Sequence, residues 1–195
     1  MTIADIIRGF DKSHIFFTSD THYHHLNYVR GTSTWQDKSK CRDFDTVEQH
    51  DSTIISNINS MVGANDLLFH LGDLALGHHS NVRKFCDALV CKNIILLRGN
   101  HASHIDDYAD CFLGIYDYLE FVINKQFFVA CHFPIASWRE MSRNSIHLHG
   151  HTHGDFENGG KSMDVGLDTN GFFPYTYGQI ISLMNSKPVV ARGHH

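Results

Sequence analysis

One short stretch, residues 147–154 (HLHGHTHG), restricts what this chain can fold into more than any other. It holds four histidines and two glycines, and no bulky apolar residue follows Leu148. It cannot be a core strand, because four imidazoles would need buried partners, and Gly150 and Gly154 would break a helix. The stretch therefore predicts a strand end that opens into a loop, where His151 and His153 project to one side and can hold a metal ion.

The rest of the chain reads as strands and helices in alternation, followed by several more strands. Apolar runs and helical spacing predict strands at 15–18, 67–71, 93–97, 118–123, 126–131, 145–149, 162–167 and 189–190, and helices at 46–61, 80–89 and 175–185. Asp45 is the expected N-cap of the first of these helices. Asn124 and Lys125 form the turn of a predicted hairpin, and a long functional loop is expected from residue 19 to about 43. This order predicts a mixed α/β fold of two packed sheets with helices outside.

Five consecutive predicted strands end in residues that bind metal ions. The motifs are Asp20-x-His22, Gly72-Asp73, Gly99-Asn100-His101, His132 and Gly150-His151-x-His153. Each motif alone has an ordinary reading, such as a loop cap, a turn or a buried histidine, but the joint pattern favours a metal site, because sites form beyond the carboxyl ends of strands in open α/β sheets. Seven ligands without a thiolate suit two ions about 3.5–4 Å apart that share a carboxylate, and not a closed zinc site. Asp73 is the natural bridge, because the glycine before it allows close approach of the backbone.

The order D-x-H, G-D, G-N-H, H, G-H-x-H resembles the motif set of the calcineurin-like metallophosphoesterases, in particular small stand-alone members of bacterial and phage type. The resemblance spans residues 15 to 168. It implies a four-layer α/β/β/α sandwich of two mixed sheets flanked by helices, with a dinuclear centre. By position, it implies one metal held by Asp20, His22, Asp73 and His153, and another held by Asp73, Asn100, His132 and His151. His101 is expected to reach the substrate instead of binding a metal.

The expected function is hydrolysis of phosphate esters by a metal-activated hydroxide, in which His101 assists the leaving group. Leu74 to Gly77, after Gly72-Asp73, contain no arginine that would grip a phosphomonoester dianion, which favours phosphodiesters of small or nucleotide substrates. The alternatives are a phosphomonoesterase, a nuclease, or a non-catalytic interaction scaffold on the same fold. Manganese is the expected metal, with iron, zinc, nickel and cobalt as alternatives.

Three further residues are candidates for substrate contact. His25 and Asn27 lie in the loop after the Asp20 motif, and Arg98 precedes Gly99. The ordinary readings are a solvated loop for the first two and a structural ion pair for Arg98. Many bacterial and phage-type members of that family also have an acidic residue after G-N-H, where this chain has Ala102, so the orientation that this carboxylate would give is absent or comes from elsewhere, such as Asp106 or Asp107.

Composition limits the remaining possibilities. The 195 residues predict one domain over 1–192, and the two histidines that end the chain after Gly193 read as a tag remnant at 193–195. A net charge of −5 disfavours a long nucleic-acid partner. Five cysteines without paired spacing, no apolar run of about 18 residues and no signal sequence predict a cytoplasmic protein that does not span a membrane.

Overall fold

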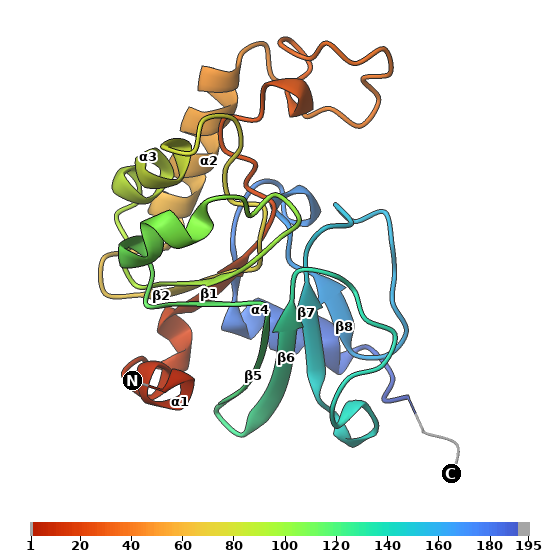
Figure 1. Ribbon diagram of the computed structural model, residues 1–195. Coiled ribbons are helices and arrows are strands. Elements are labelled where there is room, and N and C mark those ends of the chain that lie inside the picture. Colours follow the sequence, from red (N-terminus) through yellow and green to blue (C-terminus); the bar gives the residue numbers. More distant parts are fainter. Residues whose placement is uncertain (1, 191–195) are drawn as a thin grey trace.

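The structure, a computed structural model, describes residues 2–190, so the predicted tag remnant at 193–195 and the predicted domain end at 192 lie outside the described residues. Two mixed sheets form the centre of the molecule (Figure 1). The first sheet has the order β4 (Gly114–Tyr116), β3 (Ile94–Leu97), β2 (Leu67–His70), β1 (Ile15–Thr18) and β9 (Tyr175–Thr176). Its first four strands are parallel, and β9 is antiparallel to β1.

The second sheet is built on a hairpin. Its order is β5 (Tyr118–Ile123), β6 (Gln126–Cys131), β7 (Ile146–His149) and β8 (Ser162–Asp164). The turn between β5 and β6 places Asn124 and Lys125 at φ values of 48° and 69°, as a two-residue turn that matches strand twist requires. The predicted hairpin and its turn are confirmed.

Two hydrophobic cores lie on the two faces of the first sheet. On the inner face, Phe17 of β1 and Phe69 of β2 stack on each other with ring centroids 5.0 Å apart. Phe121 of the second sheet stacks on Phe69 at 4.9 Å and on its neighbour Phe128 at 5.3 Å. On the outer face, Phe16 and Leu68 belong to the core that also contains buried residues of α2 and α3. Because successive side chains of a strand point to opposite faces, Phe16 and Phe17 of β1 belong to the two different cores.

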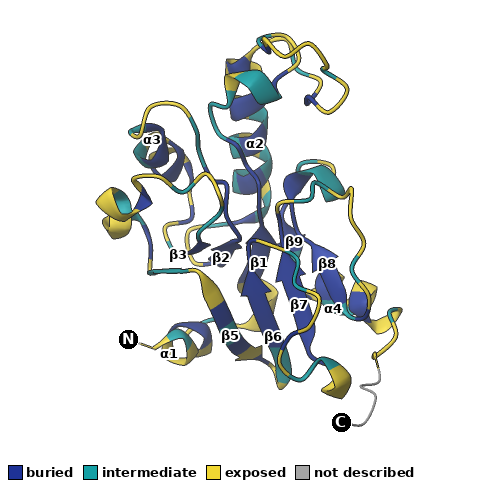
Figure 2. Ribbon diagram, turned by 45° about the vertical axis from the view of Figure 1, so that its right-hand side comes forward, coloured by how far each residue is buried: buried dark blue, intermediate teal, exposed yellow. Residues whose placement is uncertain are grey.

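Four α-helices flank the sheets. They are α1 (Ile3–Arg8), α2 (Val47–Met61), α3 (Asn81–Ala88) and α4 (Tyr177–Asn185). Short 3-10 helices lie in the connections: η1 (Lys12–His14), η2 (Leu26–Tyr28), η3 (Ile105–Cys111), η4 (Met141–Arg143) and η5 (Leu167–Thr169). Helices α1 and α4 contribute buried side chains to the core between the sheets. Figure 2 shows the central strands β1, β2 and β7 as buried, whereas the long segment between η2 and α2 is largely exposed.

The prediction of two mixed sheets flanked by helices is confirmed. Some local predictions differ. The N-cap of α2 is Thr46, whose hydroxyl accepts from the Gln49 amide, and not Asp45. The predicted strand at Val189 and Val190 is wrong, because these residues follow a proline and pair with no strand. The sequence analysis missed α1, β4 and β9, which are short elements at the edges of the fold.

Two further expectations concern the chain as a whole. All five cysteines are free thiols, as their unpaired spacing predicts. No helix within residues 2–190 has the length and hydropathy that crossing a membrane requires.

Candidate metal centre

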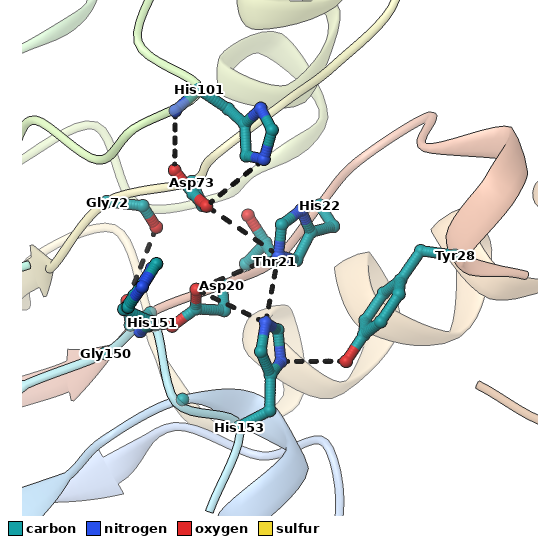
Figure 3. Close-up of polar contacts among 12 residues, drawn as sticks. Asp20, Thr21, His22, Tyr28, Gly72, Asp73, His101, Gly150, His151 and His153 are labelled. Carbon is teal, nitrogen blue, oxygen red and sulfur yellow. Dashed lines mark hydrogen bonds and ion pairs between the residues drawn. The ribbon is translucent and has the colours of Figure 1, made fainter. Parts of the chain in front are cut away.

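The parallel strands bring the predicted ligands to one edge of the first sheet. Strands β1, β2 and β3 run side by side, so the loops that follow them leave from the same edge. Strands β6 and β7 are likewise parallel, and their ends add His132 and the loop that starts at Gly150. Figure 3 shows Asp20, Asp73, His22 and His153 facing one another.

The first ligand group consists of Asp20, His22 and His153. The Nε2 atoms of His22 and His153 each lie 3.8 Å from Asp20 Oδ1 and 3.4 Å from each other. Asp20 and His22 are buried, and His153 is half-buried. Three donor atoms with lone pairs therefore converge on one point, as a metal ion requires.

The second ligand group consists of Asp20, Asp73 and His132, all buried. Asp73 Oδ2 lies 3.5 Å from His132 Nε2 and 3.9 Å from His22 Nε2, so it stands between a histidine of each group. Asp20 is the carboxylate that belongs to both groups. The sequence analysis assigned the shared role to Asp73 alone, whereas the geometry gives both carboxylates a central place.

Asn100 joins the last two predicted ligands to these groups. Its Oδ1 lies 3.0 Å from His132 Nε2 and 2.9 Å from His151 Nδ1. His151 is exposed at the rim, and its backbone amide donates to Asp20 Oδ2. All seven residues that the strand-end motifs predict as ligands therefore form one contiguous cluster, called here the ligand cluster.

The backbone at the ligand cluster is unusual. Five of the seven residues have positive φ: Asp20 (55°), His22 (47°), Asp73 (51°), His151 (70°) and His153 (50°). This conformation is unfavourable for residues with a Cβ, and such outliers concentrate at functional sites. The neighbouring glycines are required by contact: a Cβ at Gly72 would lie 2.5 Å from His132 Nδ1, and one at Gly150 would lie 2.3 Å from Asp20 Oδ2.

Asp20 shows that the ligand cluster fits a cation. Its Oδ1 is buried and has no hydrogen-bond partner among the described residues. Burial raises the pKa of Asp20 to about 6, and the neighbouring His153 and His132 offset this only in part. A buried carboxylate oxygen without a donor is costly unless it is paired with a charge. A divalent cation at this point would supply that partner.

Two of the histidines are oriented so that Nε2 carries the lone pair. His132 Nδ1 donates to the Leu71 carbonyl at 2.7 Å, which leaves Nε2 free to face Asp73. His153 Nδ1 donates to the Asp168 carboxylate at 2.6 Å, and the Tyr28 hydroxyl lies 2.9 Å from the same nitrogen. Such partners fix the tautomer and the ring plane of a metal-binding histidine.

Arg42 holds Asp168 in place, and neither residue was found from the sequence. The buried guanidinium of Arg42 donates to both Asp168 oxygens, at 2.8 and 2.7 Å, and to the backbone carbonyls of Asp20 and Thr21. The hydrogen bonds from His153 and Arg42 outweigh the effect of burial and lower the pKa of Asp168. Arg42 and Asp168 are 126 residues apart, so no local pattern in the sequence could have paired them.

His101 faces the ligand cluster from the solvent side. Its side chain is 44% exposed, and its Nε2 lies 3.9 Å from Asp73 Oδ2. Its backbone amide donates to Asp73 Oδ1, which places the ring beside the ligands but outside both groups. This is the position that a group acting on the substrate needs.

The three weaker candidates for substrate contact have different surroundings in the structure. His25 lies against the ligand cluster, with its Nδ1 3.4 Å from His22 Nδ1. Asn27 instead uses its side-chain oxygen to hold the loop, accepting from the amide and the hydroxyl of Thr34. Arg98 donates to Asp106 and Asp117, which is the structural ion pair that was the ordinary reading.

Neither Asp106 nor Asp107 of η3 lies where it could replace the acidic residue expected at position 102. Ala102 packs against the core on the outer face of the first sheet. Asp106 accepts from Arg98, and Asp107 lies 3.4 Å from His104. The acid next to the His101 ring is Asp73.

No protein-family model matches the sequence. The uncharacterized protein MJ1445 of Methanocaldococcus jannaschii is 29% identical over 185 residues, which cover 90% of this chain and 94% of that protein. The crystal structure of AQ665 from Aquifex aeolicus, a protein of unknown function, is similar with a TM-score of 0.64 and 20% identity, over 87% of this chain and 98% of that one.

An archaeal phosphodiesterase is a more distant structural match, with a TM-score of 0.45 and 19% identity over 78% of this chain and 82% of that one. The fold is thus shared with the Aquifex protein over nearly its whole length.

Proposed function

We propose that this protein is a calcineurin-like metallophosphoesterase that hydrolyses phosphate esters at two divalent metal ions, with small or nucleotide phosphodiesters as substrates. The observation that carries the proposal is the pair of ligand groups that share Asp20, because the buried Oδ1 of this residue has no hydrogen-bond partner among the described residues. Asp20, His22, Asp73 and His153 would hold one ion, and Asp73, Asn100, His132 and His151 the other, with Asp20 also available to the second ion because it belongs to both ligand groups. Bound ions of this kind supply hydroxide at neutral pH and offset charge on phosphoryl oxygens.

The protein's own groups complete the reaction. Hydrolysis would form a bond between a water-derived oxygen and phosphorus and break the bond between phosphorus and the leaving oxygen. His101 donates a proton to that leaving oxygen, because its ring is exposed beside Asp73 and lies outside the ligand groups. General acid catalysis of this kind contributes about 10²–10⁴-fold. His101→Ala should therefore keep both metals and lose most of its kcat on esters with poor leaving groups.

The arginines near the site support a diester over a monoester. A monoester dianion is commonly gripped by a free guanidinium. Arg42 is committed to Asp168, to two backbone carbonyls and to His50, so its donors face protein groups. Arg98 is paired with Asp106 and Asp117. A diester carries one negative charge, which the metal ions can neutralise without an arginine.

The test is a substrate panel with metal-free protein to which manganese, iron, zinc, nickel or cobalt is added singly. We expect bis(p-nitrophenyl) phosphate to be hydrolysed, with manganese most effective, and p-nitrophenyl phosphate to be hydrolysed more slowly. A strong preference for the monoester would overturn the diester assignment. Two bound ions per chain without hydrolysis of any ester would favour the interaction scaffold.

A further inference from the structure

Two large aromatic side chains stand at the rim of the ligand cluster instead of in a core. Trp35 is 43% exposed and Phe133 is 45% exposed. Exposing such rings loses hydrophobic stabilisation, and neither ring is needed to fill a core. Large aromatic groups beside a polar site are typical contacts for planar ligands.

Trp35 lies one side chain away from the first ligand group, on the far side of His25. Its ring meets the His25 ring edge-on, with centroids 6.0 Å apart, and His25 lies 5.2 Å from His22. Local hydrogen bonds fix this part of the loop, because the Trp35 amide donates to Ser33 Oγ and the preceding residue is tied to Asn27. The exposure of Trp35 therefore belongs to a defined conformation.

Phe133 borders the second ligand group. Its ring meets His132 at 5.0 Å and His151 at 4.8 Å, edge-on in both cases. The residue directly follows His132, and its carbonyl accepts from the Cys131 thiol. Phe133 thus contacts two histidines of the ligand cluster directly, and Trp35 reaches His22 of the first group through His25.

We propose that Trp35 and Phe133 are stacking platforms for the two organic substituents of a phosphodiester whose phosphorus is bound between them. The inference rests on the proposed function and narrows its substrate class to diesters with planar aromatic groups, of which a small dinucleotide is the biological form. A monoester could occupy only one platform. The net charge of −5 agrees with a short substrate held by stacking, because a long nucleic acid needs a basic surface.

The test compares two substrates with the same leaving group. Bis(p-nitrophenyl) phosphate retains an aryl group on phosphorus, whereas ethyl p-nitrophenyl phosphate retains an alkyl group, so the ratio of their kcat/KM values reports stacking of the retained group. With manganese present, the alanine variant of the platform that holds the retained group should lower this aryl-to-alkyl ratio by about 5–150-fold, mainly through KM, as expected from ~1–3 kcal/mol per stacked ring. The alanine variant of the other platform, which holds the p-nitrophenyl leaving group, should lower kcat/KM for both substrates alike. Trp35→Phe and Phe133→Tyr should restore most of either loss.

Phe156→Ala is the matched control, because Phe156 is 51% exposed and has no ring contact with the ligand histidines. It should leave the ratio unchanged. Equal losses on both substrates in both alanine variants, Trp35→Ala and Phe133→Ala, or no loss at all, would overturn the stacking role.

A binding measurement separates this inference from the proposed function. In a Trp138→Phe background, Trp35 is the sole tryptophan, and a dithymidine phosphorothioate should quench its fluorescence. Wild-type protein that hydrolyses neither ester refutes the proposed function, and in that case quenching still decides the stacking role. Absence of quenching overturns it, and quenching that weakens with Phe133→Ala supports it.

Discussion

The two ligand groups share Asp20 but are held in different ways. In the second group, His132 is oriented by the Leu71 backbone carbonyl, which directly follows β2. In the first group, His153 is oriented by the Asp168 side chain, which depends in turn on Arg42 from the long loop before α2. The second group is therefore built into the fold, whereas the first depends on a buried ion pair that a single substitution can remove.

The variant that affects both groups should have the largest effect. Asp20→Asn removes the carboxylate that they share, so metal content should fall at both sites and activity should drop by about 10³-fold or more, beyond the 10–100-fold typical of outer partners. Metal content is measured by mass spectrometry after dialysis. The metal-free variant should stay folded, because a neutral amide replaces an oxygen that lacks a partner. Asp106→Asn, at an exposed acid, is the control, and two retained metals in Asp20→Asn would contradict the sharing.

Removal of Arg42 should distinguish the groups through stability. Arg42→Met leaves the half-buried Asp168 without its cation and removes the hydrogen bonds of a buried side chain, which should cost about 3 kcal/mol in the free energy of unfolding. Manganese should also bind more weakly to the first group, because Asp168 no longer holds His153. Urea unfolding and calorimetric titration measure the two effects, with Arg42→Lys as the intermediate case. An unfolding free energy within about 1 kcal/mol of the wild type would show that the pair has no structural role.

A crossed pair of variants should isolate each group. Asp168→Asn should weaken metal binding in the first group by about 10–100-fold and leave the second intact. Asn100→Ala, which removes the amide between His132 and His151, should do the reverse. Titration with manganese followed by electron paramagnetic resonance counts the two classes of site. If both variants weakened the same class, the division into two groups would be wrong.

The smallest expected effect concerns His147 of β7, which lies behind the ligand cluster. Its titration should change the free energy of unfolding separately from the titration of the metal ligands. His147 Nδ1 donates to the Val129 carbonyl and Nε2 accepts from the Ile135 amide, so both nitrogens are satisfied in the neutral ring. Burial, with a smaller contribution from His149, lowers the pKa of His147 to about 4. An unfolded histidine has a pKa of about 6.5. The stabilisation of the fold by neutral His147 is therefore complete above pH 6.5 and is lost as the pH falls from 6.5 towards 4.

At pH 5 this loss amounts to about 2 kcal/mol for His147 alone. Metal-free His147→Gln can keep both hydrogen bonds without titrating, so its unfolding free energy should fall less steeply than that of the wild type between pH 6.5 and 5. Parallel pH profiles for the two proteins would mean that the acid sensitivity arises elsewhere.

Much of the fold followed from local patterns. The apolar runs at 15–18 and 67–71 predicted β1 and β2 to within one residue, and Asn124-Lys125 predicted the hairpin turn. Strands β4 and β9 were missed because they have three and two residues and depend on a neighbouring strand for their pairing. Short edge strands carry too few residues for a periodic signal.

The sequence by itself determined which side chains meet in the ligand cluster, because parallel strands deliver their carboxyl ends to one edge and each end carries a ligand. Only the tertiary structure decided how those ligands are oriented and what lies around them. Arg42 reaches Asp168, the partner of His153, across 126 residues, and the exposure of Trp35 and Phe133 depends on how their loops pack against His25 and His151. Periodicity and turn chemistry describe a chain's near neighbours, whereas these contacts exist only once the two sheets have packed.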